Sequence, residues 1–231
     1  MSAFQYDSPV LAAYPDLVGG VIVAEGLHSG PSPDALKEAF AAEQKAVLER
    51  IGDKPLSEIP SLAAWRTVFR SFGVDPTQYR SAAEALLRRL TKKGDIPSIN
   101  LLVDIGNLVS IRYGLPVAVV DRRAIVGSIT VHFADGSEVF KNLNQSEVDH
   151  PVAGEVIFSD EQGNVVARRW CWRQSDESAA GEDTTRALIT VEGHHKGAAQ
   201  DIQAALTDLC DLLGRFSGGQ FESTVLVLDP D

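Results

Sequence analysis

The amino-acid sequence predicts an α+β fold in a single domain, with a twisted, mostly antiparallel sheet packed against helices. Two observations predict it. Apolar residues recur at helical intervals through most of the first half, and at alternate positions between turn signals through most of the second. The 231 residues are 44% hydrophobic and 23% charged, which suits one substantial core. Residues 61–231 are expected to form this core, and residues 1–60 to add a strand and a helix.

The first half is expected to be mainly helical, because capping residues precede its apolar runs and glycines follow them. Its expected elements are a buried strand over residues 17–24, a helix over 33–51 capped by Ser32, a helix over 61–72, and a helix that starts at the capping box of Ser81 and Glu84.

The stretch from Pro97 to Asp121 predicts a largely buried helix, a stop at Gly114 and a strand over residues 117–120. Asn100, Asp104 and Asn107 share one face of this helix, because they lie four and three residues apart. Polar side chains on a buried helix need either hydrogen-bond partners in neighbouring loops or a functional task. The sequence leaves both interpretations open.

The second half predicts strands and hairpins. Its expected elements are strands over 124–134 and 138–143 around the turn at Asp135 and Gly136, a loop over 149–151, strands over 155–160 and 165–173, a loop over 175–185, a strand over 186–193, a helix over 198–213 and a strand over 224–228.

The strand over 165–173 alternates strongly and carries both arginines and tryptophans. Alternation places Arg169, Cys171 and Arg173 on one face. It places Arg168, Trp170 and Trp172 on the other. The tryptophans either cover a core edge or form the wall of a ligand site, and the neighbouring arginines make a ligand wall more plausible, because guanidinium groups bind anionic and carbonyl oxygens.

The charge balance argues against a broad grip on nucleic acid. Lys plus Arg number 21 and Asp plus Glu 32, a net charge of −11 that repels polyanions at long range. One dense basic cluster runs against this balance: Arg80, Arg88, Arg89, Lys92 and Lys93. It either complements a helix dipole or binds an anionic ligand.

Several classes of site find no support in the sequence. Cys171 and Cys210 fit no metal or redox spacing, and the five histidines are scattered or adjacent, so no metal is expected. No phosphate-binding loop, dinucleotide fingerprint or serine-nucleophile motif occurs, and no cofactor is expected. No apolar run approaches the roughly 18 residues that cross a bilayer, and the N-terminus lacks a signal core. We expect a soluble, cytoplasmic protein.

The central stretch resembles a segment of the bacterial phenylalanyl-tRNA synthetase beta subunit that reads approximately R-x-I-N-x-V-V-D-x-T-N-Y-V-x-x-E-x-G-Q-P-x-H-A-F-D. The positions that agree in register are Ile99, Asn100, Val103, Asp104, Asn107, Val109, Gly114, Pro116 and Asp121. That segment belongs to the synthetase's editing domain, the B3/B4 tRNA-binding domain. The later order of elements is also similar, over about residues 65–193. The chain resembles a free-standing form of this domain.

The resemblance implies an α+β fold and trans-editing, in which water attacks the ester of a mischarged amino acid at the tRNA 3′ end. On this hypothesis Asp104 and Gln174 are catalytic, and the tRNA acceptor end or aminoacyl-tRNA is the partner. The side chains expected to line the substrate site are Asn100, Asn107, Arg169, Trp170, Trp172 and Arg173. Those expected to bind tRNA phosphate are Arg80, Arg88 and Arg89.

Two positions depart from the family pattern. Ala118 stands where the family has a pocket histidine, and W-R-Q-S-D-E-S replaces its G-G-E-x-S-G loop, with Gln174 or Asp176 nearest the family's glutamate. A second hypothesis therefore stands beside the first: a non-catalytic module that keeps the fold and binds RNA, an amino acid or a protein. The acidic charge favours this second hypothesis, whereas the arginines favour the hydrolase.

Overall fold

The computed structural model of the protein describes residues 3–142 and 148–227. The helices in this part of the chain are α1 (Ser8–Ala13), α2 (Asp34–Ile51), α3 (Pro60–Ser71), α4 (Ala82–Lys93), α5 (Leu101–Tyr113) and α6 (Ala198–Phe216). The strands are β1 (Phe4–Tyr6), β2 (Val18–Glu25), β3 (Val117–Asp121), β4 (Ile129–Phe133), β5 (Phe140–Lys141), β6 (Val148–Asp149), β7 (Val156–Ser159), β8 (Val165–Arg168), β9 (Arg173–Gln174), β10 (Arg186–Gly193) and β11 (Gln220–Val227). None of these helices is both long and apolar enough to cross a bilayer.

The strands form two larger sheets and a small ribbon. One sheet has the order β1-β4-β7-β8-β9, the second has the order β11-β2-β10-β3, and the ribbon pairs β5 with β6. Among the described strands only β1 and β4 pair in parallel. The predicted α+β class with a mostly antiparallel sheet is confirmed. The sheet is divided in two, because β4 pairs with β7 and β1 instead of continuing from β3.

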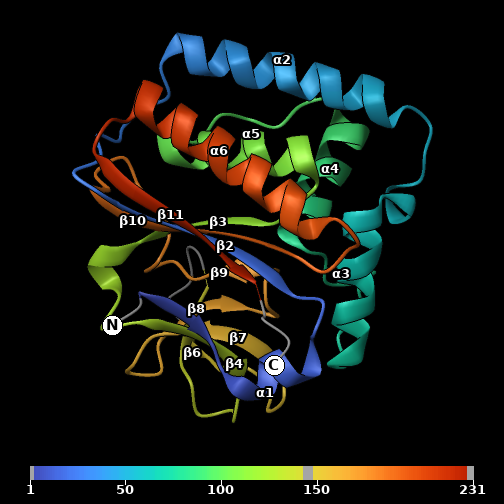
Figure 1. Cartoon of the computed structure of the whole chain (residues 1–231), viewed down its shortest axis with the longest axis vertical. Helices are drawn as coiled ribbons and strands as arrows, with labels where there is room; N and C mark the ends of the chain where they lie inside the picture. The colour runs from blue at the N-terminus through green and yellow to red at the C-terminus, as the bar shows by residue number, and fades with distance from the viewer. Residues whose placement is uncertain (1–2, 143–147, 228–231) are drawn as a thin grey trace.

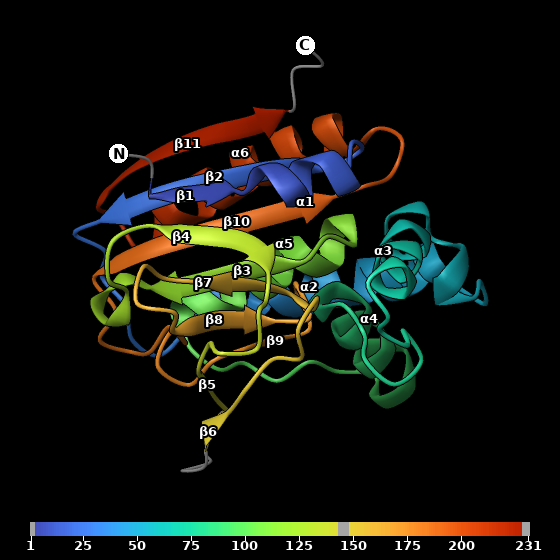
Figure 2. The same cartoon turned by 90° about the horizontal axis from the view of Figure 1, so that it is seen from below.

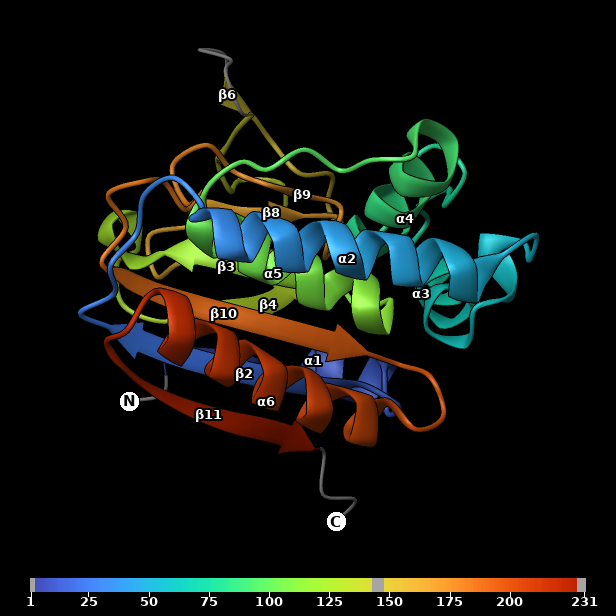
Figure 3. The same ribbon diagram turned by 90° about the horizontal axis from the view of Figure 1, so that it is seen from above.

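The elements stack in layers (Figure 1). Helices α5 and α6 lie on one face of the four-stranded sheet, and α2 packs outside α5. The five-stranded sheet lies against the other face of the four-stranded one (Figure 2). Seen from above, α6 crosses the strands β10, β2 and β11 (Figure 3). One apolar cluster fills the space between helices and sheet, and a second, richer in aromatic rings, fills the space between the sheets.

Two adjacent glycines in β2 let other elements approach the sheet closely. A Cβ on Gly20 would lie 2.6 Å from a methyl carbon of Ile202 in α6. A Cβ on Gly19, on the opposite face, would lie 2.4 Å from the hydroxyl oxygen of Tyr6. Gly19 therefore allows the Tyr6 ring, carried by β1, to lie across β2 and reach β10.

The local helix signals are largely confirmed. Asn100 caps α5, with its Oδ1 accepting from the backbone N–H of Val103, and Gly114 ends that helix in the left-handed conformation. Ser81 caps α4. Ser32 was expected to cap α2, but Pro33 is the capping residue and the Ser32 hydroxyl binds elsewhere.

Three strand predictions are wrong. The predicted strand over 165–173 ends at Arg168, and the chain turns back at residues 169–172 to form β9 against β8. The predicted pairing around Asp135 and Gly136 does not form, because β4 pairs with β7. Strand β5 pairs with β6, which includes Asp149 of the expected 149–151 loop. The segment over 124–134 becomes a strand only from Ile129. The expected ends at Leu143 and Leu228 lie outside the described residues.

Candidate active site

A row of polar side chains lies on β10 between the two larger sheets. Thr190 and Glu192 of β10 alternate with His194, which directly follows the strand, and all three are buried. The opposite face carries Ile189 and Val191, which belong to the core against the helices. Buried polar groups on a strand that faces an aromatic core cost free energy unless they find partners.

Glu192 finds two hydrogen-bond donors, but among the described residues no cation pairs with it. The Tyr6 hydroxyl donates to its Oε1 at 2.8 Å, and the Trp170 indole N–H donates to the same oxygen at 2.9 Å. The side chain is 2% exposed. Burial raises the pKa of Glu192 from its ordinary 4.5 to about 7, although the two hydrogen bonds oppose the rise. Near neutral pH this carboxyl can therefore both take up and release a proton.

His194, just after the end of β10, is enclosed by aromatic rings. The centroids of Trp65, Trp170 and Tyr14 lie 4.6, 5.1 and 5.9 Å from its ring. Burial lowers the pKa of His194 to about 3, and its Nε2 has no hydrogen-bond partner among the described residues. His194 is therefore neutral at physiological pH and puts no charge beside Glu192.

Trp170 reaches Glu192 because the turn between β8 and β9 holds an unusual backbone conformation. Arg169 and Trp170 have φ angles of 44° and 60°, in the left-handed region that costs side-chain-bearing residues roughly 1–2 kcal/mol each. The turn is tied down on both sides: the Trp170 N–H donates to the Val156 carbonyl at 2.6 Å, and the Ala82 N–H of α4 donates to the Cys171 carbonyl at 2.8 Å. Backbone strain held in place in this way is typical of functional sites.

The same turn stacks arginines on aromatic rings at the protein surface. The Arg169 guanidinium carbon lies 3.9 Å from the Tyr79 ring centroid and 4.5 Å from that of Trp172. Arg173 also stacks on Trp172, at 4.5 Å. We call Tyr79, Arg169, Trp172 and Arg173 the stacked rim. The sequence placed Arg169 and Arg173 on the face opposite to Trp172. This prediction is wrong, because the turn folds both arginines onto the Trp172 ring.

A cavity of about 70 Å³ connects the stacked rim to Glu192. Four of the side chains predicted for the site line it: Trp170, Trp172, Arg173 and Gln174. Ala118, Thr190 and Glu192 also line it, together with apolar residues such as Phe158 and Cys171. Burial holds the pKa of the Cys171 thiol well above its ordinary value, so this thiol is not a nucleophile at neutral pH.

Gln174 has a fixed orientation at the cavity wall. Its amide nitrogen donates to the carbonyl oxygens of Val119 and Ser178, at 2.9 and 2.7 Å. Both amide hydrogens are therefore used by the backbone, and the amide oxygen is left to accept a hydrogen bond.

The three polar residues of α5 do not line the cavity. Asn100 caps the helix and donates to the Ala180 carbonyl at 2.9 Å. Asp104 is fully buried and accepts hydrogen bonds from the hydroxyls of Ser32 and Ser98, at 2.6 and 2.5 Å, and from the Ile99 N–H at 2.9 Å. Asn107 is half-buried on the same helix. For Asn100 and Asp104, the structure shows hydrogen bonding to neighbouring loops.

Replacing Asp104 with asparagine is expected to lower the free energy of unfolding by about 2 kcal/mol, because an amide group would face three donors that now bind a carboxylate. Urea unfolding at pH 7 measures this, with Asp53→Asn at an exposed position as the matched control. An unchanged unfolding midpoint would contradict the structural role. If deacylation were also lost in that case, Asp104 would return as a catalytic residue.

The basic cluster is divided between the two ends of α4. Arg80 lies just before the helix, next to Tyr79 of the stacked rim, and pairs with Glu84 at 3.8 Å. Arg88 and Arg89 lie about 12 Å further along the helix, where Arg89 donates to the Asp95 carbonyl. Of the three arginines predicted to bind phosphate, Arg80 is the one placed beside the rim.

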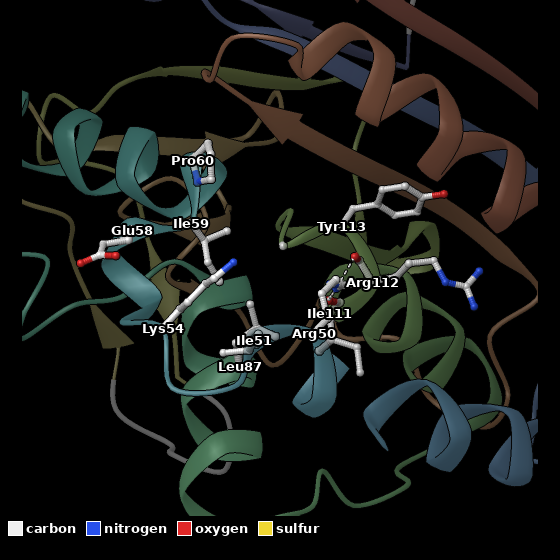
Figure 4. Close-up of a pocket in the computed structure, with 11 residues that line it drawn as sticks. Arg50, Ile51, Lys54, Glu58, Ile59, Pro60, Leu87, Ile111, Arg112 and Tyr113 are labelled. Carbon is white, nitrogen blue, oxygen red and sulfur yellow. Dashed lines mark hydrogen bonds between the residues drawn. The ribbon is translucent and has the colours of Figure 1, made fainter. Parts of the chain in front are cut away.

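A larger hollow, of about 470 Å³, lies where the ends of α2 and α5 meet the start of α3 (Figure 4). Its arginines are already engaged. Arg112 pairs with Glu43 and Asp208, and Arg50 donates to the Arg112 carbonyl at 2.7 Å, which satisfies a carbonyl group at the end of α5. None of the predicted site residues lines this hollow. Its two arginines therefore serve the packing of the helices.

Among the residues that the structure adds to the predicted site are Tyr6 and Glu192. An acidic residue in the otherwise apolar run A-L-I-T-V-E-G was the available signal for Glu192. Tyr6 gave no signal, since its role depends on β1 pairing with β4, far away in the chain. Among the described residues, no cluster of His, Cys, Asp and Glu side chains could hold a metal ion.

Comparison with known proteins identifies the family. The sequence profile of the B3/4 domain matches residues 64–217, about two thirds of the chain. The chain belongs to the B3/4 domain family. The predicted resemblance is thereby confirmed, and the B3/4 match contains the whole cavity lining, from Ala82 to Glu192. Tyr6 is supplied from outside it.

One solved structure and the curated proteins complete the comparison. The crystal structure of an N-terminal fragment of the phenylalanyl-tRNA synthetase beta subunit from Pyrococcus horikoshii is similar over 95% of this chain, with a TM-score of 0.48 and 14% sequence identity. The chain spans 50% of that fragment. No curated protein matches this B3/4 chain.

Proposed function

We propose that this B3/4 protein is a hydrolase that removes mischarged amino acids from the 3′ end of tRNA, and that the cavity between Glu192 and the stacked rim is its active site. The observation that carries the proposal is a single cavity with a buried, proton-exchanging carboxyl and an arginine–tryptophan surface at its mouth. A carboxyl that exchanges protons can activate water for ester hydrolysis, and an arginine–tryptophan surface can stack with and bind a nucleotide end.

The chemistry assigns the role of general base to Glu192. In its ionised form the carboxylate takes a proton from a water molecule, and the resulting hydroxide attacks the carbonyl carbon of the ester. The bond between that carbon and the 3′ oxygen then breaks, and the 3′ oxygen receives the proton back from Glu192. The products are a free amino acid and an uncharged tRNA. A general base works best when its pKa lies near the operating pH, as the pKa of about 7 for Glu192 does.

Gln174 has a supporting role in this scheme. Its amide oxygen is free to accept a hydrogen bond, because the Val119 and Ser178 carbonyls hold both of its amide hydrogens. An acceptor fixed in this way can orient the attacking water toward the ester. We transfer the role of base from Asp104 to Glu192, because the fully buried Asp104 carboxylate already binds Ser32, Ser98 and Ile99 and does not line the cavity.

The stacked rim is assigned to the nucleotide end. Trp172 and the guanidinium planes on it offer stacking surfaces for a base, and the exposed Arg173 and nearby Arg80 offer positive charge to phosphate. A small basic contact of this kind is compatible with the acidic chain, because it requires only the end of the tRNA to approach.

Removing the Arg173 side chain is expected to raise KM for aminoacyl-tRNA about tenfold, with kcat changing much less, because stacking and charge at the rim act on binding. Steady-state kinetics of Arg173→Ala test this. Arg215→Ala is the matched control, since Arg215 also stacks on an aromatic ring, that of Phe216 on α6. Equal effects of the two substitutions on KM would show that the stacked rim does not belong to the binding site.

The proposal as a whole is tested by deacylation of a panel of labelled aminoacyl-tRNAs, correctly charged and mischarged, with the wild type and Glu192→Gln. Selective release of one amino acid, lost in the variant, is the expected result. No release from any member of the panel, with enzyme in excess over tRNA, would overturn the hydrolase.

One observation favours a second function, that of a non-catalytic module that binds an aminoacyl or nucleotide end. Ala118 lines the cavity at the position where the resembling editing segment has a histidine, so one polar group of that site is missing here. Tight binding of an aminoacyl-tRNA without release in the same panel would favour this module.

A further inference from the structure

The cavity that ends at Glu192 is too small for an aromatic side chain. Its volume is about 70 Å³, less than half of the roughly 150 Å³ of an engineered protein cavity that accepts benzene. A phenyl or phenol ring does not fit into this space, whereas a methyl or hydroxymethyl group does.

The innermost wall, Trp170, is held so that a simple side-chain rotation cannot move it out of the cavity. Trp170 is fixed at its indole N–H by Glu192 and at its backbone N–H by Val156. Its ring also meets the edges of Tyr14 and Trp65, with centroids 4.9 and 5.3 Å away. Moving this indole would break the hydrogen bond to Glu192 and disrupt an aromatic core, so the space beside it is set by the fold.

The position of the base requires the acyl group to enter the cavity. Glu192 is 2% exposed, whereas Arg173, on the same cavity, is exposed at the surface. Water held by Glu192 can attack only a carbonyl carbon that lies inside the rim. The side chain on the neighbouring carbon must then be accommodated inside as well.

Taken together, the volume, the fixed Trp170 wall and the buried base lead to one substrate class. We propose that the site selects small acyl groups, of glycyl, alanyl or seryl size, carried on a nucleotide end, and excludes aromatic acyl groups. The inference rests on the proposed function and specifies its substrate.

Two non-hydrolysable analogues test the inference on the wild-type protein. In 3′-deoxy-3′-(L-alanylamino)adenosine and its L-phenylalanyl counterpart an amide replaces the ester. Isothermal titration calorimetry is expected to show that the alanyl analogue binds at least tenfold more tightly, although the phenylalanyl analogue offers more apolar surface. Equal affinities, tighter binding of the phenylalanyl analogue, or no binding of either would overturn the inference.

A pair of variants tests whether the cavity itself makes the selection. Ala118→Leu adds bulk to the lining and is expected to lower the affinity for the alanyl analogue at least tenfold. Ala41→Leu makes the same chemical change at an exposed position of α2 and is expected to leave the affinity unchanged. Circular dichroism verifies that both variants are folded, and the analogue comparison on the wild type stands without either of them. An unchanged affinity in folded Ala118→Leu would overturn the assignment to this cavity.

Because amides are not hydrolysed, these outcomes are separate from those of the deacylation panel. A preference for the alanyl analogue without release of any amino acid would sustain the size selection and overturn the hydrolase. Release of tyrosine or phenylalanine from tRNA, with equal binding of both analogues, would sustain the hydrolase and overturn the size selection.

Discussion

Glu192→Gln is expected to slow deacylation of the preferred aminoacyl-tRNA by a factor of about 10² to 10⁴, the range that a well-placed general base supplies. Glutamine keeps the size of the side chain, and its Oε1 can accept the same hydrogen bonds from Tyr6 and Trp170. It has no lone pair basic enough to take a proton from water. The loss is therefore expected in kcat, measured in single-turnover reactions at saturating enzyme.

The pH dependence of the wild type gives an independent check of the same role. The rate should rise with pH and level off above about 7, as Glu192 loses its proton. Other groups around Glu192 do not titrate there: burial keeps His194 neutral, with its pKa at about 3, and raises the pKa values of Tyr6 and Cys171 well above their ordinary values.

The control for these kinetics is Glu182→Gln, the same chemical change at an exposed position of the 175–185 loop. It is expected to leave both the rate and the pH profile unchanged. A Glu192→Gln enzyme with at least half of the wild-type rate would show that the carboxyl is not the base. The hydrolase would then need another source of activated water.

The parts of the fold that could be predicted from the sequence are those set by neighbouring residues. The Asn100 cap and the Gly114 stop depend on backbone groups within a few positions, and both are found as expected. The family motif around them is likewise local, and Ala118, which stands where the family has a pocket histidine, lines the cavity.

The turn at residues 169–172 could not be predicted, because it contains none of the usual turn residues. The run R-W-C-W alternates as a strand does, and left-handed backbone at Arg169 and Trp170 is contrary to their local preference. What holds the turn is distant in the chain: the Val156 carbonyl, the start of α4 and the Glu192 carboxylate. Local patterns carry no information on such contacts. Because the turn was not predicted, the orientations of Arg169, Trp172 and Arg173 were not predicted either.

Asp104 illustrates the opposite case, in which the local signal of a buried polar group was correct and the structure supplies its hydrogen-bond partners. The sequence showed that a buried carboxylate on α5 needs partners or a task. Its partners lie in two different loops: Ser32 just before α2, and Ser98 between α4 and α5. Glu192 poses the same question, but its donors leave the carboxyl facing a cavity. A structural carboxyl is therefore distinguished from a reactive one by its surroundings: protein donors alone at Asp104, and donors together with a cavity at Glu192.

The same Glu192→Gln substitution is expected to stabilise the folded protein at high pH. In the unfolded chain the carboxyl ionises near its ordinary pKa of 4.5, whereas in the folded protein it ionises near 7. Between these values the folded state holds more protons than the unfolded state, so the free energy of unfolding falls as the pH rises. The cost of the buried carboxylate is fully present above about pH 7.5 and amounts to about 3 kcal/mol.

Glutamine carries no such cost, so the variant should exceed the wild type by up to about 3 kcal/mol at pH 8 and match it near pH 4.5. Urea unfolding at both pH values measures the two differences, with Glu182→Gln as the control that should show neither. Equal stability at pH 8 would mean that the Glu192 carboxylate is ionised in the folded protein at no cost. Its pKa would then be near the ordinary value, and it would be too weak a base for the proposed reaction. A variant that is more stable but inactive would instead show that the Glu192 carboxyl destabilises the fold and is required for catalysis.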